Sequence, residues 1–291
     1  YQKSTDDGRT FAPQVSVLKH QRSAGKLTVH DAWYAWFENG RGDTITASYV
    51  YHPCANPGHT NHRNETYYML MDCRDGSWTN VQGEKLTLPV TKESADKFTL
   101  IQATSTERTN HGTCRVDAEG RPHVYFRFPH GEVRYFRWDG EAWLPPTKVA
   151  DASGGGRDGD FIIDSPLKVR MLLNQSRGGI GSIDWWNTTD GGRTWAKGDN
   201  VFSLNGAGFE MTTLVRNAHP DARMLVGGQV DNQEHLYRRM YLIGDRGPLT
   251  RVAAEASHLG DRLELIKVLP KGTPKKDAKR KKKLGSADNE P

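Results

Sequence analysis

Residues 49–68 carry several side chains that can do acid–base or metal chemistry. They include three of the eleven histidines, His52, His59 and His62, and one of the three cysteines. Apolar residues alternate before and after the polar part of this stretch, which predicts a strand, a loop and a second strand. We expect His59, His62 and the adjacent Arg63 to lie at the end of a sheet, where such groups can neutralise a substrate carboxylate. The alternative is an exposed polar loop that binds nothing.

A further histidine lies in a strand-like segment near the middle of the chain. His123 and Tyr125 alternate with Val124 and Phe126, so the two pairs face opposite sides of the predicted strand. Two interpretations stay open for His123 and Tyr125: they line a substrate groove, or they pack between neighbouring sheets. Basic side chains that would suit an acidic polysaccharide also gather here, at Arg127, His130, Arg134 and Arg137.

A repeated turn motif indicates the elements that position these residues. Residues 4–11 and 188–195 share the pattern Ser/Thr-x-Asp-x-Gly-x-Thr-aromatic, and looser copies occupy residues 72–78 and 138–143. Asp and Gly favour a tight turn, the hydroxyl groups bond the turn backbone, and the final aromatic side chain can pack between sheets. The pattern predicts equivalent corners of repeated sheets, against the alternative of hairpin turns that match by chance.

Strand-like segments form four groups of four. The groups are residues 32–37, 44–51, 66–71 and the segment after Trp78; 112–116, 123–128, 133–138 and the segment after Trp143; 160–163, 167–173, 180–186 and the segment after Trp195; and 209–215, 224–230, 236–243 and 249–252. One such sheet cannot bury both of its faces alone, so repeated sheets must stack around an axis. We predict an all-β fold, a β-propeller of four-stranded blades.

The net charge of +5 belongs to the C-terminal end of the chain. Residues 271–291 hold eight of the 40 Lys and Arg and three of the 35 Asp and Glu, which leaves 32 of each in residues 1–270. The neutral body gives no sign of a nucleic-acid-binding surface. We predict that residues 1–268 form the propeller and that residues 269–291 are a disordered basic tail.

The cysteine count and the ends of the chain limit the class of protein further. Three cysteines exclude a complete disulfide framework. No apolar run approaches the ~20 residues that a bilayer-spanning helix needs, and no signal-peptide pattern is visible. Because the chain begins inside a turn motif, we expect a propeller that is incomplete at its N-terminus.

The turn motif resembles the Asp-box of sialidase-like (BNR-repeat) β-propellers, which joins the third and fourth strands of a blade. Residues 63–68, 75–80 and 83–90 resemble the R-N-x-x-Y-Y, D-G-x-x-W-x-N and G-x-x-L-x-L-P runs of one BNR-repeat family, and residues 116–124 resemble its next inner strand. Members with known activity include ulvan lyases and enzymes that cleave rhamnose–glucuronate linkages. The resemblance covers residues 1–255 and implies a seven-bladed type, of which about four to five blades are present.

The resemblance implies a polysaccharide lyase that cleaves a uronate-containing polymer by β-elimination. A cation or amide neutralises the uronate carboxylate, a Tyr or His removes the C5 proton, and a Tyr or His protonates the leaving oxygen. Tyr34 is the best match to a Tyr on the family's inner strand, and blades nearer the N-terminus would supply further groups. We predict catalytic roles for Tyr34, His59 and His62 and substrate binding by Arg63, His123 and Tyr125.

The same resemblance implies a structural zinc site around an H-x-C pair. His52 and Cys54 form such a pair, and Cys73 would be the further Cys ligand from a following strand. Imidazole and thiolate groups in a closed tetrahedral set suit zinc. The alternative is that both cysteines are small buried hydrophobic residues. We expect no organic cofactor.

The expected partner is an acidic polysaccharide, with no nucleic acid and no membrane span, and the substrate implies a secreted or periplasmic location. Other functions compete with the lyase: a histidine-dependent rhamnosidase-type glycoside hydrolase, a non-catalytic carbohydrate-binding propeller, and a sialidase. The ordered set of arginines and the Tyr–Glu pair of a sialidase are not found in the sequence. A lyase releases an unsaturated uronate that absorbs ultraviolet light, whereas a binding module leaves the polymer intact.

Overall fold

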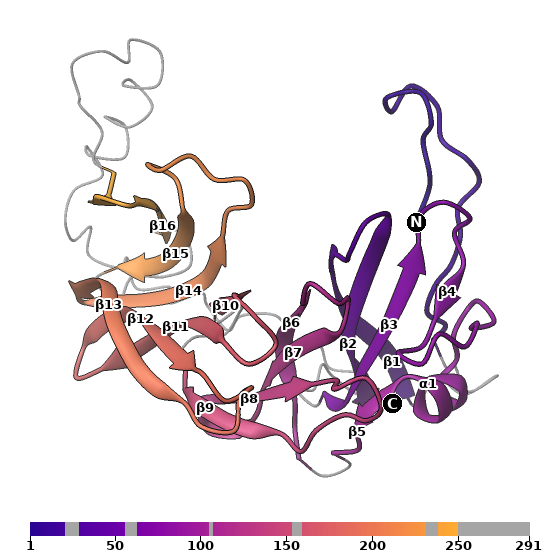
Figure 1. Ribbon diagram of the computed structural model, residues 1–291, viewed down its shortest axis with the longest axis horizontal. Helices are drawn as coiled ribbons and strands as arrows, with labels where there is room; N and C mark the ends of the chain where they lie inside the picture. The colour runs from indigo at the N-terminus through magenta and orange to yellow at the C-terminus, as the bar shows by residue number, and fades with distance from the viewer. Residues whose placement is uncertain (21–28, 56–62, 105–106, 153–158, 231–237, 250–291) are drawn as a thin grey trace, which may run out of the picture. The chain divides into compact units, whose positions relative to one another are not determined.

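Four antiparallel sheets follow one another along the chain in the computed structural model, which describes residues 1–20, 29–55, 63–104, 107–152, 159–230 and 238–249 (Figure 1). All of these residues belong to one unit, Tyr1–Leu249. The predicted basic tail, residues 269–291, lies outside the described residues, and so do His59 and His62. Within the described ranges, no helix is long and apolar enough to cross a bilayer.

Each sheet is built from consecutive strands in chain order. The first contains β1 (Val29–Asn39), β2 (Thr44–Ala55), β3 (Asn64–Asp72) and β4 (Trp78–Thr79). The second contains β6 (Asn110–Val116), β7 (Pro122–Arg127), β8 (Glu132–Arg137) and β9 (Thr147–Asp151). The third contains β10 (Gly159–Ile163), β11 (Val169–Arg177), β12 (Ile180–Thr188) and β13 (Ala196–Asn205). The fourth contains β14 (Ala207–Leu214), β15 (Met224–Val230), β16 (Arg238–Gly244) and β17 (Gly247–Pro248).

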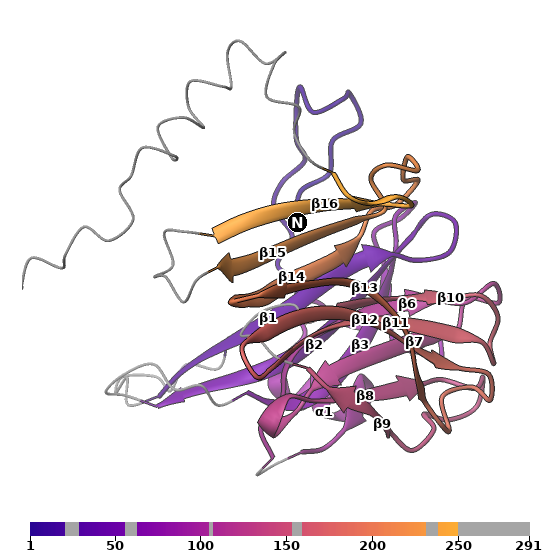
Figure 2. The same cartoon turned by 90° about the vertical axis from the view of Figure 1, so that its left-hand side faces the viewer.

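The first strands of successive sheets lie next to one another. β1 contacts β6, β6 contacts β10, and β10 contacts β14. Figure 2 shows the fourth sheet, from β14 to β16, following the third, and β14 also contacts β11 and β12. This arrangement confirms the predicted β-propeller, and we call the four sheets blades 1 to 4.

Hydrophobic cores fill the spaces between successive blades. Val124 and Phe126 of β7 join a buried cluster with Tyr68 of blade 1. Tyr125, which lies between them in the chain, packs instead with Phe161 of blade 3. Because neighbouring side chains of a strand point to opposite faces of its sheet, one blade contributes to two cores. The blades therefore stabilise one another by burying apolar surface that none could bury alone.

Blade 1 departs from the predicted four strands. β4 has only 2 residues, and it is followed by a helix, α1 (Lys92–Phe98), and by β5 (Leu100–Gln102), which pairs with β3. The Thr91 hydroxyl caps the helix by accepting a hydrogen bond from the Ser94 N–H at 3.1 Å. The sequence did not predict this helix because one buried residue, Ala95, makes no periodic apolar pattern.

The two close copies of the turn motif make the same hydrogen bonds. The Asp190 carboxylate accepts from the backbone N–H of Thr194 at 3.0 Å and from its hydroxyl at 2.6 Å. Asp6 accepts the same two bonds from Thr10, at 2.9 and 2.7 Å. The bonds from Thr10 lower the pKa of Asp6 to about 2. The local pattern therefore specifies the turn without help from its surroundings.

The surroundings of the two turns differ. Residues 188–195 connect β12 with β13, the third and fourth strands of blade 3, and Trp195 packs on Tyr135 of blade 2 with ring centroids 5.2 Å apart. Residues 4–11 precede the first described strand, and 60% of Phe11 is exposed. Among the described residues, only the turn at residues 188–195 thus joins two blades.

Candidate functional site

Tyr34, His52 and Arg63 come together at one end of blade 1. The rings of Tyr34 on β1 and His52 on β2 have centroids 5.1 Å apart. The guanidinium carbon of Arg63, the residue before β3, lies 4.3 Å from the centroid of the Tyr34 ring. His52 and Arg63 are buried, and Tyr34 is partly exposed. We call these three residues the Tyr34 cluster; it joins one predicted catalytic residue, one predicted metal ligand and one predicted substrate contact.

The backbone around Arg63 is held in an irregular conformation. The pairing of β2 with β3 shifts between Tyr49 and Tyr51, and Glu65 has a φ of 61°, in the left-handed region that residues other than glycine rarely adopt. Such an irregularity bends a strand and redirects its side chains, and it is common next to active sites. The Arg63 carbonyl accepts a hydrogen bond from the Thr109 N–H at 2.6 Å, which ties this end of β3 to the start of blade 2.

The Arg63 side chain keeps unused hydrogen-bonding capacity. Its Nε is buried and has no hydrogen-bond partner within the described part of the chain. A buried guanidinium nitrogen without a partner is costly, so such a group is well suited to meet an anion that arrives with a ligand. The predicted role of Arg63 as a carboxylate contact stays a prediction, and this geometry supports it.

A positively lined cavity of about 360 Å³ lies beside Thr109. Arg108, Arg127 and His130 contribute to its walls, together with Asn110, the first residue of β6. We call it the Arg108 cavity. Since Thr109 also bonds Arg63, the cavity lies at the same end of the blades as the Tyr34 cluster. Guanidinium groups, which suit the binding of anions, thus occur in both places.

The structure divides the basic patch that the sequence indicates on blade 2. Arg127 and His130 line the Arg108 cavity. Arg134 instead pairs with Glu107 and with Glu132, at 2.6 Å in each case. Arg137 donates to the carbonyl of Pro166 at 2.7 Å. The sequence reasoning missed Arg108, because it lies in a polar connection without any periodic pattern that would mark it.

His123 and Tyr125 are both fully buried, with 0% of each residue exposed. The Tyr125 hydroxyl donates to the Gly159 carbonyl of blade 3 at 2.6 Å. His123 shares a hydrogen bond between its Nδ1 and the Tyr135 hydroxyl, and its Nε2 lies 3.6 Å from Asp117. Burial lowers the pKa of His123, which keeps the ring neutral. These contacts support the interpretation that both residues pack between sheets, while substrate binding by them stays a prediction.

The three predicted zinc ligands do not come together. Cys73 donates its N–H to the carbonyl of Asp43, just before β2 begins, whereas His52 and Cys54 lie near the end of β2. At ~3.3 Å per residue, the nine residues from position 43 to position 52 span roughly 30 Å. Bonds of about 2.0–2.3 Å bring the ligands of one zinc ion far closer than this. His52 and Cys73 therefore do not fit one ion.

The described residues offer no other group of three His, Cys, Asp or Glu side chains that could hold a metal ion. The β1–β2 register pairs Ala32 with His52 and His30 with Cys54. The side chain of Cys54 lies outside what the structure describes. A zinc site at His52 and Cys54 thus stays a prediction, with Cys73 no longer among its ligands.

Comparison with known proteins confirms the family that the motifs indicate. The model of the BNR repeat-containing family matches residues 1–148. An ulvan lyase from Alteromonas sp. (strain LOR) is 37% identical over 267 residues, which cover 86% of this chain and 54% of that enzyme. An ulvan lyase from Nonlabens ulvanivorans is 36% identical over 278 residues, covering 90% of this chain and 58% of that enzyme. The chain thus spans a little over half the length of these relatives.

Solved structures give a consistent result. A PL25 ulvan lyase matches with a TM-score of 0.78 and 34% identity, over 93% of this chain and 62% of that one. The structure of such a lyase bound to -[GlcA(1-4)Rha3S]- matches with the same TM-score of 0.78. Identity at this level over most of the chain indicates common ancestry and not only a shared architecture.

Proposed function

This chain belongs to the BNR repeat-containing family, and on that premise we propose that it acts as a polysaccharide lyase on a uronate-containing polysaccharide of the ulvan type. Relatives named ulvan lyases, 36–37% identical over 86–90% of the chain, support the reaction and the substrate class. The single structural observation that carries the proposal is the contact of the Arg63 guanidinium with the Tyr34 ring. It brings a carboxylate-binding group beside a hydroxyl that can transfer a proton.

The proposed reaction is a β-elimination. Arg63 neutralises the uronate carboxylate, which makes the proton on C5 more acidic. A base removes that proton, the bond between C4 and its glycosidic oxygen breaks, and a double bond forms between C4 and C5. The Tyr34 hydroxyl donates its proton to the departing oxygen, and His52 and Arg63 hold the phenol ring by packing against it. We propose that His59 or His62, which are predicted catalytic residues outside the described ranges, is the base.

Replacing Tyr34 with Phe tests this role, since the variant keeps the ring and loses only the hydroxyl. We expect the rate of unsaturated uronate release from ulvan, followed by ultraviolet absorbance with the full-length protein, to fall by about 10²–10⁴-fold. Tyr241→Phe is the matched control, because it removes a Tyr hydroxyl from β16 of blade 4, which is outside the Tyr34 cluster and makes no hydrogen bond among the described residues. The control should retain the full rate.

Two outcomes would contradict the proposal. Full activity of the Tyr34→Phe protein would remove Tyr34 from the mechanism. An unmodified protein that binds ulvan and releases no unsaturated uronate would be a carbohydrate-binding propeller instead of a lyase.

Three further properties belong to the same proposal. We infer that residues 188–195 and 4–11 are Asp-boxes, because their hydrogen bonds are the same. We propose a secreted or periplasmic location, because a large polymer must be degraded outside the cytoplasm. A structural zinc at His52 and Cys54 is also proposed, with its other ligands supplied by residues other than Cys73.

A further inference from the structure

A second arginine-lined cavity, of about 760 Å³, lies where the first strands of blades 2, 3 and 4 end. We call it the Arg115 cavity. Its volume is in the range of sites that bind small ligands. The charged side chains in its wall are Arg115, Arg170, Arg216, Arg223 and Asp245, and Trp185 is one of its two aromatic side chains, with Phe161. Each of the four arginines also pairs with a carboxylate: Arg115 with Asp160, Arg170 with Asp164, Arg216 with Glu38 and Arg223 with Asp245.

The Arg115 cavity lies at the opposite end of the blades from the Tyr34 cluster. Asn110, the first residue of β6, lines the Arg108 cavity, whereas Val116, the last residue of the same strand, lines the Arg115 cavity. The 7 residues of this strand extend over roughly 20 Å. Arg63 is tied to the first of these ends through Thr109. A sugar bound in the Arg115 cavity is therefore out of reach of the Tyr34 hydroxyl.

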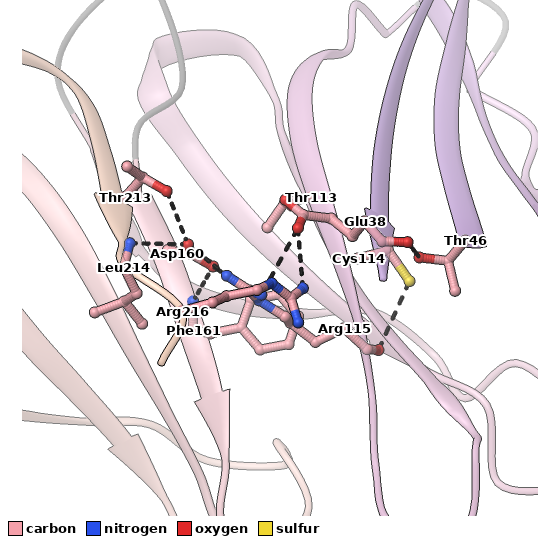
Figure 3. A network of polar contacts seen from close by, with 10 residues as sticks. All are labelled: Glu38, Thr46, Thr113, Cys114, Arg115, Asp160, Phe161, Thr213, Leu214 and Arg216. Atoms are coloured by element: carbon pink, nitrogen blue, oxygen red, sulfur yellow. Dashed lines mark hydrogen bonds and ion pairs between the residues drawn. The ribbon is translucent and has the colours of Figure 1, made fainter. Parts of the chain in front are cut away.

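Of the ion pairs that hold the four arginines in place, those of Arg115 and Arg216 lie beside the same carboxylate, Glu38. Arg115 donates to Asp160 at 2.7 Å and lies 3.7 Å from Glu38, and Arg216 donates to the same Glu38 at 3.0 Å (Figure 3). A guanidinium has five N–H donors. Arg216 uses one nitrogen on Glu38, and 42% of its side chain is exposed. Arginine side chains that ion pairs already hold in place, and that have unused N–H donors, can bind an anion at little cost in conformational entropy.

Trp185 adds an apolar surface to the same wall. The guanidinium carbon of Arg170 lies 5.4 Å from the centroid of the Trp185 ring, and Arg170 is also held by Asp164 at 2.8 Å. Trp185 packs partly against the core of blades 3 and 4 and is partly exposed in the cavity. A sugar ring can stack on such a surface while its acidic group meets a neighbouring guanidinium.

We infer that the Arg115 cavity is a second binding site for an anionic saccharide, which holds the polymer without cleaving it. The guanidinium groups recognise carboxylate or sulfate groups, and Trp185 recognises the sugar ring. The choice of ligand rests on the proposed function, since a lyase acting on a uronate polymer meets chains that carry such groups along their length. A second binding site at the far end of the blades would keep the polymer near the enzyme between cleavage events.

The test is a titration of the full-length Tyr34→Phe protein with an ulvan tetrasaccharide, followed by proton–nitrogen NMR of the Trp185 indole N–H. We expect this signal to shift with the ulvan fragment and not with a neutral cellulose tetrasaccharide. Arg216→Ala should weaken the binding by about tenfold, which corresponds to the loss of one charge-assisted contact. Arg170→Ala is a second variant with the same expected effect. Arg74→Ala is the matched control, because Arg74 is another exposed arginine in an aspartate ion pair and lines neither cavity.

The inference is overturned if the Trp185 signal does not move, if the neutral sugar moves it equally, or if both arginine variants bind as tightly as the Arg74→Ala control. The readout does not require catalysis. Absence of cleavage by the unmodified protein, with binding that Arg216→Ala weakens, would refute the lyase proposal and support the binding site.

Discussion

Burial changes the chemistry of single side chains in the cores between the blades. Cys114 is fully buried between blades 1 and 2, and this burial raises the pKa of its thiol from 9.0 to about 12. Because the pKa of the thiol is higher in the folded protein than in the unfolded chain, burial of the neutral thiol contributes its full stabilisation below pH 9. That contribution is lost as the pH rises from 9 towards 12. Cys114 therefore behaves as a small buried hydrophobic residue.

We therefore expect Cys114 to resist alkylation by iodoacetamide at mildly alkaline pH, because the thiolate is the reactive form and the residue has no exposed surface. Cys73, which is partly exposed, should react under the same conditions. Mass spectrometry of the labelled peptides, with and without denaturant, measures both rates. Equal labelling of Cys114 in the native and the denatured protein would contradict this account.

At the scale of the strands, one buried ion pair connects three blades. Asp160, at the start of β10, accepts from Arg115 of β6 at 2.7 Å and from the Leu214 N–H of β14 at 3.0 Å. Its side chain is fully buried, and 13% of the Arg115 side chain is exposed. Such a pair adds little compared with an apolar contact, but the loss of one partner leaves a buried charge uncompensated.

Asp160→Asn should therefore lower the free energy of unfolding by about 3–5 kcal/mol. The matched control is Asp164→Asn, because Asp164 pairs with Arg170 on the partly exposed rim and should cost only ~0–1 kcal/mol. Chemical denaturation of the two variants and the unmodified protein measures the difference. Equal midpoints for the two variants would show that the Asp160 ion pair does not hold the blades together.

At the scale of the whole described unit, the turn at residues 188–195 connects blade 3 to blade 2. Gly192 has a φ of 89°, and a Cβ at this position would overlap the ring of Tyr135 on β8. The Thr147 hydroxyl of β9 donates to the Gly192 carbonyl. The glycine is needed for two reasons at once: the backbone conformation and the close approach of the next blade.

Gly192→Ala should lower the thermal midpoint by more than the strained backbone alone explains. Gly178→Ala isolates the backbone effect, because Gly178 has a φ of 59° and no atom within 4 Å of the added carbon. We expect a cost of about 1 kcal/mol for the control and of about 2–4 kcal/mol for Gly192→Ala, which adds the overlap. Calorimetry of both variants is the measurement. A control as destabilised as Gly192→Ala would mean that the contact with blade 2 contributes nothing.

The residues that the sequence marks correctly are those whose signal is local. The turn at 188–195 is specified by Thr188, Asp190 and Thr194, which bond one another within a few positions. The strands of blades 2 and 3 follow from short runs of β-branched and aromatic residues, such as Val124, Tyr125 and Phe126 in β7. The helix α1 was missed, because it has only about two turns and a single buried residue.

The sequence by itself determined the propeller of stacked sheets, the repeated turn and the family, because each depends on short-range patterns of residue type. Only the tertiary structure decided which chemical groups meet. It brought Arg63 onto the Tyr34 ring, separated Cys73 from His52 along the length of β2, and gathered arginines from three blades into the Arg115 cavity. These relations join residues far apart in the chain, and they depend on strand register and blade stacking, which no local pattern encodes.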